Sequence, residues 1–270
     1  MRLCVRLGIL YVLFGLGVFF FQGSILYLPD RTVAFTPEAI GMAFEELRLV
    51  ASDGVRVAAW YVPRDDAVGS VIVFHGTGGN LGDQLAKIRE FHGFGYHVLA
   101  VDYRGYGLSE GRPSEPGTYL DAEAAWAHLV DARGESPGRI VVFGESLGGG
   151  VAIELARRHE PGLLMVECTF TSIADVAQRM LWMLPMRLIV RHRYSSIEKV
   201  GAIGCPKLFI HGREDEVVPF SLGRRLFEAA APPKLFIETG GQHNDGGFLY
   251  DRETTRRVRE AMESLRPGGS

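Results

Sequence analysis

The chain has 270 residues, of which 47% are hydrophobic and 23% charged, and its formal net charge is −3. This composition excludes a disordered or collagen-like chain and a disulfide-dense small domain, while the length fits one large α/β domain or two smaller ones. The sequence has no basic block able to follow a phosphate backbone, so we expect no nucleic-acid partner.

The first predicted element is an apolar helix at the N-terminus. No charged residue occurs from Leu7 until Asp30, and a helix of this length would span roughly 34 Å, enough for a bilayer. Arg2 and Arg6 precede the stretch, which predicts an N-terminus in the cytoplasm. We therefore predict a single-pass membrane anchor over residues 1–30.

The rest of the chain, residues 31–270, is predicted to be one domain on the extracytoplasmic side of the membrane. A cleaved signal peptide is the alternative, with Gly15-Leu16-Gly17 as the small-residue cleavage site. That cut would fall inside the most apolar run, with bulky residues after it, which favours retention of the segment.

Eight apolar runs predict eight strands. Two of them flank Ser-Asp-Gly at 52–54 and predict an antiparallel hairpin, and the other six lack polar alternation, which is typical of strands buried on both faces. The runs are Leu47–Val50, Val55–Val62, Val71–Phe74, Val98–Val101, Ile140–Phe143, Leu163–Val166, Leu208–Ile210 and Leu235–Ile237. Helical patterns lie between and after them, at Leu81–Phe91, Tyr119–Val130, Leu147–Arg158, Leu222–Ala230 and Thr254–Leu265. This alternation predicts an α/β fold, with a mostly parallel eight-stranded sheet and helices on both faces.

One longer connection interrupts the alternation. No strand pattern occurs between Phe170 and Ile203, and the segment contains the apolar run Met180–Met186. Its length predicts a small helical cap inserted at about 171–202, and a packed crossover helix is the alternative.

The strongest chemical motif is Gly144-Glu145-Ser146-Leu147-Gly148, which directly follows a predicted strand and opens a helical pattern. Gly-x-Ser-x-Gly in this context is typical of a nucleophile elbow, where small neighbours allow a strained turn to present the serine oxygen. We predict Ser146 as the nucleophile, at a helix N-terminus that favours developing negative charge.

A serine hydroxyl needs a base, and His243 is the best candidate among eight histidines. It follows the last predicted strand and Gly240-Gly241, a loop able to swing an imidazole over the sheet. A carboxylate must orient that base, and Asp215 lies just after the strand Leu208–Ile210. Glu214 and Glu216 are rivals by spacing alone.

Asp102 is a further candidate for the acid, but it precedes Ser146. The hydrolase order of serine, acid and histidine favours the residues after the later strand. The oxyanion needs two backbone donors, for which we predict the amides of Leu147 and Thr77. Thr77 lies in the glycine-rich loop 75–80; a phosphate-binding loop is the less favoured reading, because no Lys-Ser/Thr follows.

With these motifs in order, the sequence resembles the α/β-hydrolases, in particular a membrane-anchored branch similar to serine-aminopeptidase-like and depalmitoylase-like hydrolases. The matching pieces cover roughly residues 45–250 and are His75–Asn80, Asp102–Gly111, Gly144–Gly149, His211–Asp215 and Gly241–His243. The resemblance implies the α/β-hydrolase fold and selects Asp215 over its glutamate neighbours. It also implies that the N-terminal segment is retained.

The resemblance assigns Asp102 and Arg104 a structural role in a loop beside the site. One departure is Thr77, where this branch often carries Asn, so any role of an Asn side chain is lost.

The predicted function is hydrolysis of carboxylic esters or thioesters by Ser146, His243 and Asp215, without a metal or organic cofactor. An apolar acyl group is expected because Met180, Trp182 and Met183 offer an adaptable apolar surface for substrate. Alternatives are a peptidase or amidase on small peptides, acyl transfer to an alcohol, and a non-catalytic membrane-tethered binding module. The three cysteines, Cys4, Cys168 and Cys205, are too widely spaced for a zinc site or a disulfide framework.

Overall fold

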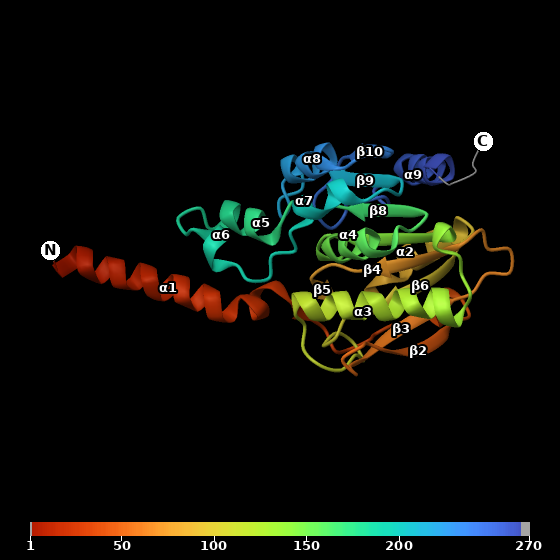
Figure 1. Cartoon of the computed structure of the whole chain (residues 1–270), viewed down its shortest axis with the longest axis horizontal. Coiled ribbons are helices and arrows are strands. Elements are labelled where there is room, and N and C mark those ends of the chain that lie inside the picture. The colour runs from red at the N-terminus through yellow and green to blue at the C-terminus, as the bar shows by residue number, and fades with distance from the viewer. Residues whose placement is uncertain (1, 266–270) are drawn as a thin grey trace.

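The computed structural model describes residues 2–265, and its centre is one eight-stranded sheet (Figure 1). The strand order is β10-β9-β8-β7-β4-β6-β3-β2, and only the pairings of β3 with β2 and with β6 are antiparallel. The strands are β2 (Glu45–Val50), β3 (Arg56–Val62), β4 (Ser70–Phe74), β6 (His97–Val101), β7 (Ile140–Glu145), β8 (Leu163–Glu167), β9 (Lys207–Gly212) and β10 (Lys234–Thr239). The predicted mostly parallel, eight-stranded sheet is confirmed.

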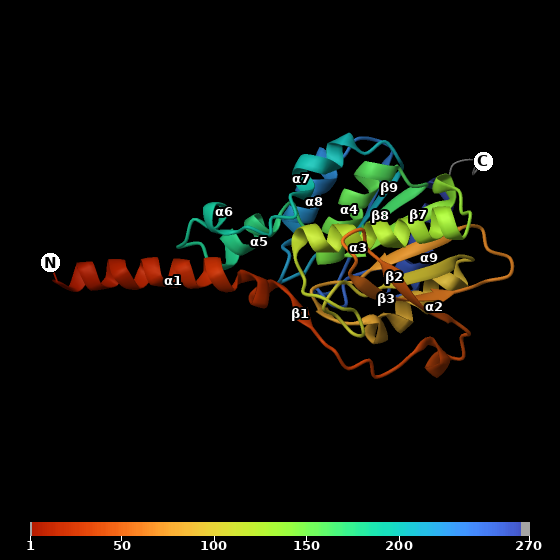
Figure 2. The same ribbon diagram turned by 60° about the horizontal axis from the view of Figure 1, so that its bottom comes forward.

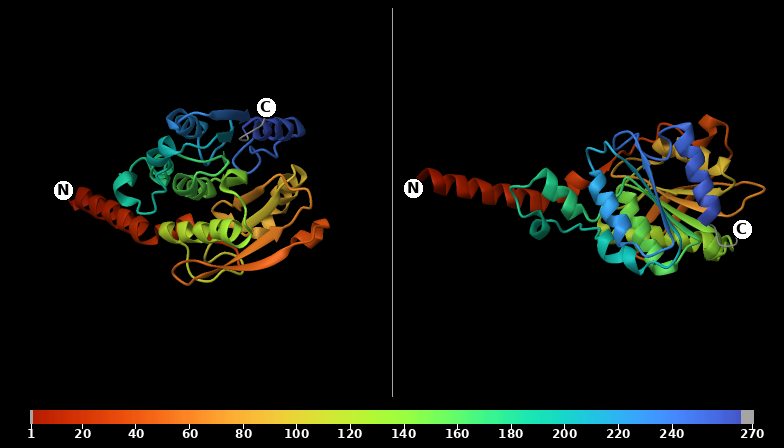
Figure 3. Two further views of the ribbon diagram at one scale, coloured as in Figure 1. Left: turned by 45° about the vertical axis from the view of Figure 1, so that its right-hand side comes forward. Right: turned by 90° about the horizontal axis from the view of Figure 1, so that it is seen from above.

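Helices cover both faces of the sheet, as the left view of Figure 3 shows. The helices are α1 (Arg2–Leu26), α2 (Leu85–Gly93), α3 (Glu115–Ala127), α4 (Leu147–His159), α5 (Ile173–Met180), α6 (Met186–Ile189), α7 (Ser196–Lys199), α8 (Phe220–Ala229) and α9 (Arg252–Leu265). Short 3₁₀ or π turns occupy Pro37–Ile40, Leu81–Gln84, His128–Ala132, Pro137–Arg139 and Val200–Ala202.

Alternate residues of each central strand belong to two separate hydrophobic cores. In β4, Ile72 and Phe74 pack with residues of α3, α4 and α8, whereas Val71 and Val73 pack with residues of α2 and α9. All four side chains are at most 1% exposed. This burial on both faces explains why the strand sequences lack polar alternation.

The helix predicted at Tyr119–Val130 begins earlier in the structure, at Glu115. Ser114 caps it by accepting a hydrogen bond from the amide of Gly117 (3.2 Å), and Pro116 lies in the first turn. The helical turn before Tyr119 contains Pro116 because proline is tolerated where helical amides have no intrahelical partner.

Helix α1 projects from the body, with α5 and α6 beside it (Figures 1 and 2). Val18 of α1 shares an apolar cluster with Ala174, Leu184, Met186 and Val190. The segment Cys4–Leu26 has a mean hydropathy of 2.2 and is long and apolar enough, by length and composition alone, to cross a membrane. As predicted, the chain between Phe170 and Ile203 forms no strand.

A two-residue strand follows α1 and reaches the edge of the sheet at which β4 ends. β1 (Leu28–Pro29) pairs in parallel with β5 (Gly78–Gly79), which belongs to the glycine-rich loop after β4. The segment after the N-terminal helix is therefore hydrogen-bonded to that loop.

Candidate active site

Ser146 occupies a sharp turn between β7 and α4. Its φ of +51° and ψ of −113° lie in a strained region for a residue with a side chain. A Cβ on Gly144 would lie 2.1 Å from the carbonyl oxygen of Gly148, and one on Gly148 would lie 2.2 Å from that of Phe74. Only glycine fits at these two positions, which is the physical reason for the Gly-x-Ser-x-Gly pattern.

Three side chains from separate strand ends form one hydrogen-bonded relay. His243 Nε2 lies 3.0 Å from Ser146 Oγ, and His243 Nδ1 lies 2.8 Å from Asp215 Oδ2. The other oxygen of Asp215, Oδ1, accepts hydrogen bonds from the amides of Val217 (3.0 Å) and Val218 (2.7 Å). This geometry permits His243 to take a proton from Ser146 while Asp215 orients the imidazole.

The relay changes the acidity of both of its titratable members. Burial opposes ionisation of Asp215, but contacts with His211 and His243 and the amide of Val218 outweigh it and hold the pKa of the carboxyl well below its usual value. Burial likewise opposes a charged His243, yet the hydrogen bond and charge of Asp215 raise the pKa of the imidazole above 6.5. Asp215 therefore remains a carboxylate beside a strengthened base.

The glycine-rich loop after β4 lies directly beside Ser146. A Cβ on Gly76 would be 3.7 Å from the Cβ of Ser146. The carbonyl oxygen of Thr77 accepts hydrogen bonds from the hydroxyl of Tyr106 (2.6 Å) and the amide of Leu28 (3.0 Å). Leu147 begins α4, so its amide has no acceptor four residues back. The loop and the helix start thus place two amide-bearing segments next to Ser146.

Two cavities meet at Ser146 and Thr77. One, of about 490 Å³, is the more polar of the two: glycines, Ala86 and Leu249 line it together with Asp83, Lys87, Glu145 and His243. The other, of about 520 Å³, is mainly apolar and lies between the C-terminal half of α1 and α5–α6.

The three residues predicted to bind substrate do not all reach the cavity that contains Ser146. Met180, at the end of α5, lines that apolar cavity and also a smaller one of about 110 Å³ against Tyr11 and Phe14 of α1. Trp182 and Met183 follow α5 and line the smaller cavity. The structure therefore brings only Met180 to the wall of the Ser146 cavity.

A charged cluster that no sequence pattern predicted lies next to Ser146, since it includes the preceding residue, Glu145. Lys87 Nζ lies 2.5 Å from Glu145 Oε2 and 2.9 Å from Glu167 Oε1. Burial opposes the charge on Lys87, but the two carboxylates raise the pKa of its ammonium. Glu145 belongs to the serine motif, whereas Lys87 comes from α2 and Glu167 from β8, so no local pattern identified the cluster.

The rival acids have other environments. Glu214 is exposed, and Glu216 accepts a hydrogen bond from the backbone amide of His243 (3.2 Å). Asp102 Oδ1 lies 3.3 Å from His75 Nε2 and accepts from the amide of Leu81 (3.0 Å).

Arg104, expected to be structural, forms ion pairs with Asp53 (2.6 Å) and Asp121 (2.9 Å). These contacts fasten the loop after β6 to α3 and to the turn between β2 and β3.

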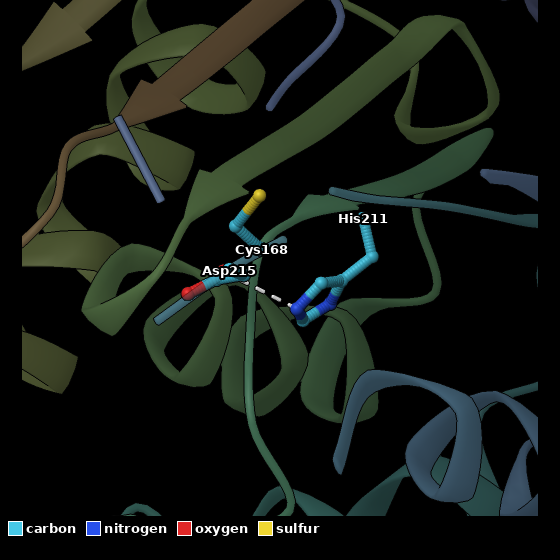
Figure 4. A group of neighbouring side chains, drawn as sticks. All are labelled: Cys168, His211 and Asp215. Carbon is cyan, nitrogen blue, oxygen red and sulfur yellow. Dashed lines mark ion pairs between the residues drawn. The ribbon is translucent and has the colours of Figure 1, made fainter. Parts of the chain in front are cut away.

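Cys168, His211 and Asp215 have donor atoms within 4.8 Å of one another, and Figure 4 shows the three side chains close together. Burial raises the pKa of the Cys168 thiol, whereas a metal requires the thiolate. His211 Nε2 donates to the carbonyl oxygen of Val218 (2.9 Å) and lies 3.3 Å from Asp215 Oδ2. This chemistry suits positioning of Asp215 better than metal binding.

Comparisons with known proteins match this architecture. The profile of the family described as serine aminopeptidase, S33, matches residues 65–194. The chain is 33% identical over 261 residues to the alpha/beta hydrolase domain-containing protein WAV2 of Arabidopsis thaliana, with 85% of both chains covered. It is 31% identical over 245 residues to the lysophosphatidylserine lipase ABHD12 of Macaca fascicularis, covering 77% of this chain and 59% of that protein.

Among solved structures, the esterase Pf2001 of Pyrococcus furiosus superposes with a TM-score of 0.73 at 22% identity, covering 89% of this chain and 100% of that one. At this identity the likeness concerns the fold.

Proposed function

Because the chain belongs to the α/β-hydrolase superfamily, we propose that it is a serine hydrolase that cleaves carboxylic esters or thioesters with an apolar acyl group. The observation that carries the proposal is the hydrogen-bonded relay from Asp215 through His243 to Ser146, at the junction of two cavities. The sequence relatives include a protein named as a lipase, which supports an acyl substrate.

In the first half-reaction, Ser146 Oγ attacks the carbonyl carbon while His243 Nε2 takes the hydroxyl proton. The amides of Thr77 and Leu147 donate to the developing oxyanion, and one such donor typically lowers the barrier by about 3 kcal/mol. The tetrahedral intermediate collapses, and His243 gives the proton to the leaving alcohol or thiol. Ser146 then carries the acyl group.

In the second half-reaction, water attacks the acyl-enzyme and gives a proton to His243. Collapse of the second intermediate releases the carboxylic acid, and the proton returns to Ser146. Asp215 stays ionised throughout and stabilises the imidazolium. No step requires a metal or an organic cofactor.

The substrate assignment depends on the chemistry of the two cavities. Transfer of an acyl chain out of water lowers the free energy, which favours its binding in the apolar cavity beside Met180. The polar cavity beside Lys87 and Glu145 suits the leaving group. Peptides or aminoacyl amides are the competing substrates, because the same relay cleaves amides and the matching family profile is that of a serine aminopeptidase.

The proposal includes the predicted domain organisation. Residues 1–30 would anchor the protein, residues 31–270 would form the hydrolase domain on the extracytoplasmic side, and residues 171–202 would form its cap. The length of the apolar stretch supports an anchor, and Arg2 and Arg6 at its N-terminal end support this orientation. A reporter fused to the C-terminus tests it, since activity of the reporter in the cytoplasm would contradict the orientation.

The central test is covalent labelling of the purified full-length protein with a fluorophosphonate. We expect Ser146→Ala to abolish labelling and to lower ester hydrolysis at least about 10³-fold. Ser52→Ala is the matched control, because Ser52 is an exposed turn residue, and this variant should behave as wild type. Equal labelling of Ser146→Ala and wild type would refute the assignment of Ser146 as the nucleophile.

Substrate preference is tested with a chain-length series of p-nitrophenyl esters beside aminoacyl amides. Faster turnover of the amides would replace the esterase assignment by the peptidase one. Hydrolysis of none of these substrates, together with absent labelling, would favour the binding module.

A further inference from the structure

The N-terminal helix contributes a whole face to the cavity that contains Ser146. Val18, Gln22, Ile25 and Leu26 line this cavity, and their spacing of four, three and one residues places them on one side of α1. Phe170, Val176 and Met180 are among the residues lining the cavity from the other side. A helix that serves only as an anchor has no reason to present a face to the nucleophile.

The polar residue on this face of α1 does not make the cavity hydrophilic. Gln22 Oε1 accepts from the amide of Arg191 (2.6 Å), and its Nε2 donates to the carbonyl oxygen of Phe19 (2.7 Å). The Gln22 side chain is buried, and its carboxamide group binds α1 to the segment after α6. The remaining wall of α1 is aliphatic.

The same segment of chain is joined to the catalytic loops by hydrogen bonds. The Tyr27 and Tyr194 hydroxyls lie 2.9 Å apart, and the amides of Leu28 and Asp30 donate to the carbonyl oxygens of Thr77 (3.0 Å) and Gly79 (3.2 Å). These bonds hold the end of α1 in register with the loop beside Ser146. The position of the cavity wall relative to the nucleophile is therefore built into the fold.

The rim of the cavity continues into exposed apolar surface. Ile25 and Leu28 line the cavity and are also 62% and 56% exposed. Other exposed apolar side chains lie on or beside α5 and α6, next to α1 in Figures 1 and 2: Met180, Trp182, Met183 and Leu188. Exposed apolar side chains gathered on neighbouring elements suit contact with the apolar phase of a bilayer.

We propose that the C-terminal half of α1 is one wall of the acyl-chain site, so that the acyl chain bound to Ser146 lies between α1 and α5–α6 and enters from the membrane. This inference rests on the proposed serine hydrolase function and adds where the acyl chain binds and which part of the membrane segment selects it. The cavity volume of about 520 Å³ falls in the range usual for ligand pockets.

The polar cavity on the other side of Ser146 is the competing place for the acyl chain. Its wall contains Lys87 and Glu145, an ion pair of 2.5 Å that an alkyl chain would strip of water. Removing water from charged groups opposes binding there, whereas the apolar cavity imposes no such cost. The two cavities therefore differ in how favourably they bind an alkyl chain, and the end of a bound chain should lie in the apolar one.

The direct test uses wild-type, full-length protein in nanodiscs, with an alkyl fluorophosphonate of about twelve carbons carrying a terminal diazirine. The probe attaches to Ser146, and illumination then marks whatever lies at the chain end. We expect cross-linked peptides from residues 18–28 and 173–190. Cross-links confined to residues 79–87 or 244–249 would overturn the inference while leaving the nucleophile intact.

A second test measures chain-length selection with a matched pair of full-length variants. Ile25→Trp adds bulk at the cavity rim, and we expect it to lower the ratio of kcat/KM for twelve-carbon to four-carbon esters by at least about tenfold. Ile9→Trp makes the same change at an exposed position of α1 outside this cavity, and its ratio should equal that of wild type.

An unchanged ratio in Ile25→Trp, or an equal fall in both variants, would contradict the inference. If Ile25→Trp does not fold, the cross-linking result on wild type decides. Failure of the proposed function is a different outcome, because it would appear as absent labelling of wild type or equal labelling of Ser146→Ala.

Discussion

Replacing Asp215 by Asn tests the relay most sharply, because the structure determines how the new amide must lie. Oδ1 of Asp215 faces two backbone donors, the amides of Val217 and Val218 at 3.0 and 2.7 Å. Only the carbonyl oxygen of an Asn can accept those bonds, so its NH₂ group must replace Oδ2 and face His243 Nδ1. Nδ1 must then act as an acceptor, and the proton moves to Nε2.

An imidazole that carries its neutral-form proton on Nε2 cannot accept the proton of Ser146. From this change of tautomer we expect kcat to fall by about 10⁴-fold, or about 5.5 kcal/mol of barrier, for Asp215→Asn. The assay is the acylation burst with p-nitrophenyl butyrate, together with the rate of fluorophosphonate labelling.

Glu214→Gln is the matched control, because it removes the same charge from the neighbouring exposed position. We expect it to change kcat less than about twofold. A loss below tenfold in Asp215→Asn, or a comparable loss in Glu214→Gln, would refute the tautomer argument and reopen the choice of acid.

Three further predictions concern pH and stability. Because the pKa of His243 is raised and only its neutral form is a base, kcat/KM should fall as pH decreases through an apparent pKa higher than that of an unperturbed imidazole; an acid limb centred below the pKa of an unperturbed imidazole would contradict this. Gly148→Ala forces a Cβ to 2.2 Å from a backbone oxygen, so we expect a loss of at least about 3 kcal/mol in urea unfolding, whereas Gly138→Ala, with nothing within 4 Å, should lose less than about 1 kcal/mol. Asp121→Ala removes the fully buried partner of Arg104 and should cost about 3–5 kcal/mol in the same measurement; a loss under 1 kcal/mol would show that Asp53 alone satisfies the guanidinium.

Where the signal was local, the sequence predicted the structure closely. Asn80 begins its helical turn with a reciprocal capping contact to Asp83, which depends only on the residue types three positions apart. The strand, turn and helix around Ser146 follow from glycines whose neighbours leave no room for a Cβ. The start of α3 was predicted too late in the sequence, because a proline in the first turn of a helix gives the same local signal as a proline that ends one.

Long-range contacts were beyond local patterns. Lys87 meets Glu167 across 80 residues, and Gln22 meets the amide of Arg191 across 169. Nothing within a window of sequence distinguishes these polar residues from solvent-exposed ones. Trp182 and Met183 illustrate the same point, since their apolar character did not reveal that, unlike Met180, they do not line the cavity that contains Ser146.

The sequence by itself determined the α/β alternation, the strained serine turn, and the order of serine, acid and histidine along the chain, because these depend on residue types at short spacing. Only the tertiary structure decided that the apolar N-terminal helix lines the cavity that contains Ser146 and that the amide of Leu28 binds the loop of Thr77. The physical reason is that a cavity exists only where distant segments pack together and leave space between them. Each wall of the cavity is by itself an ordinary apolar helix face, and the sequence does not show which segment packs against it.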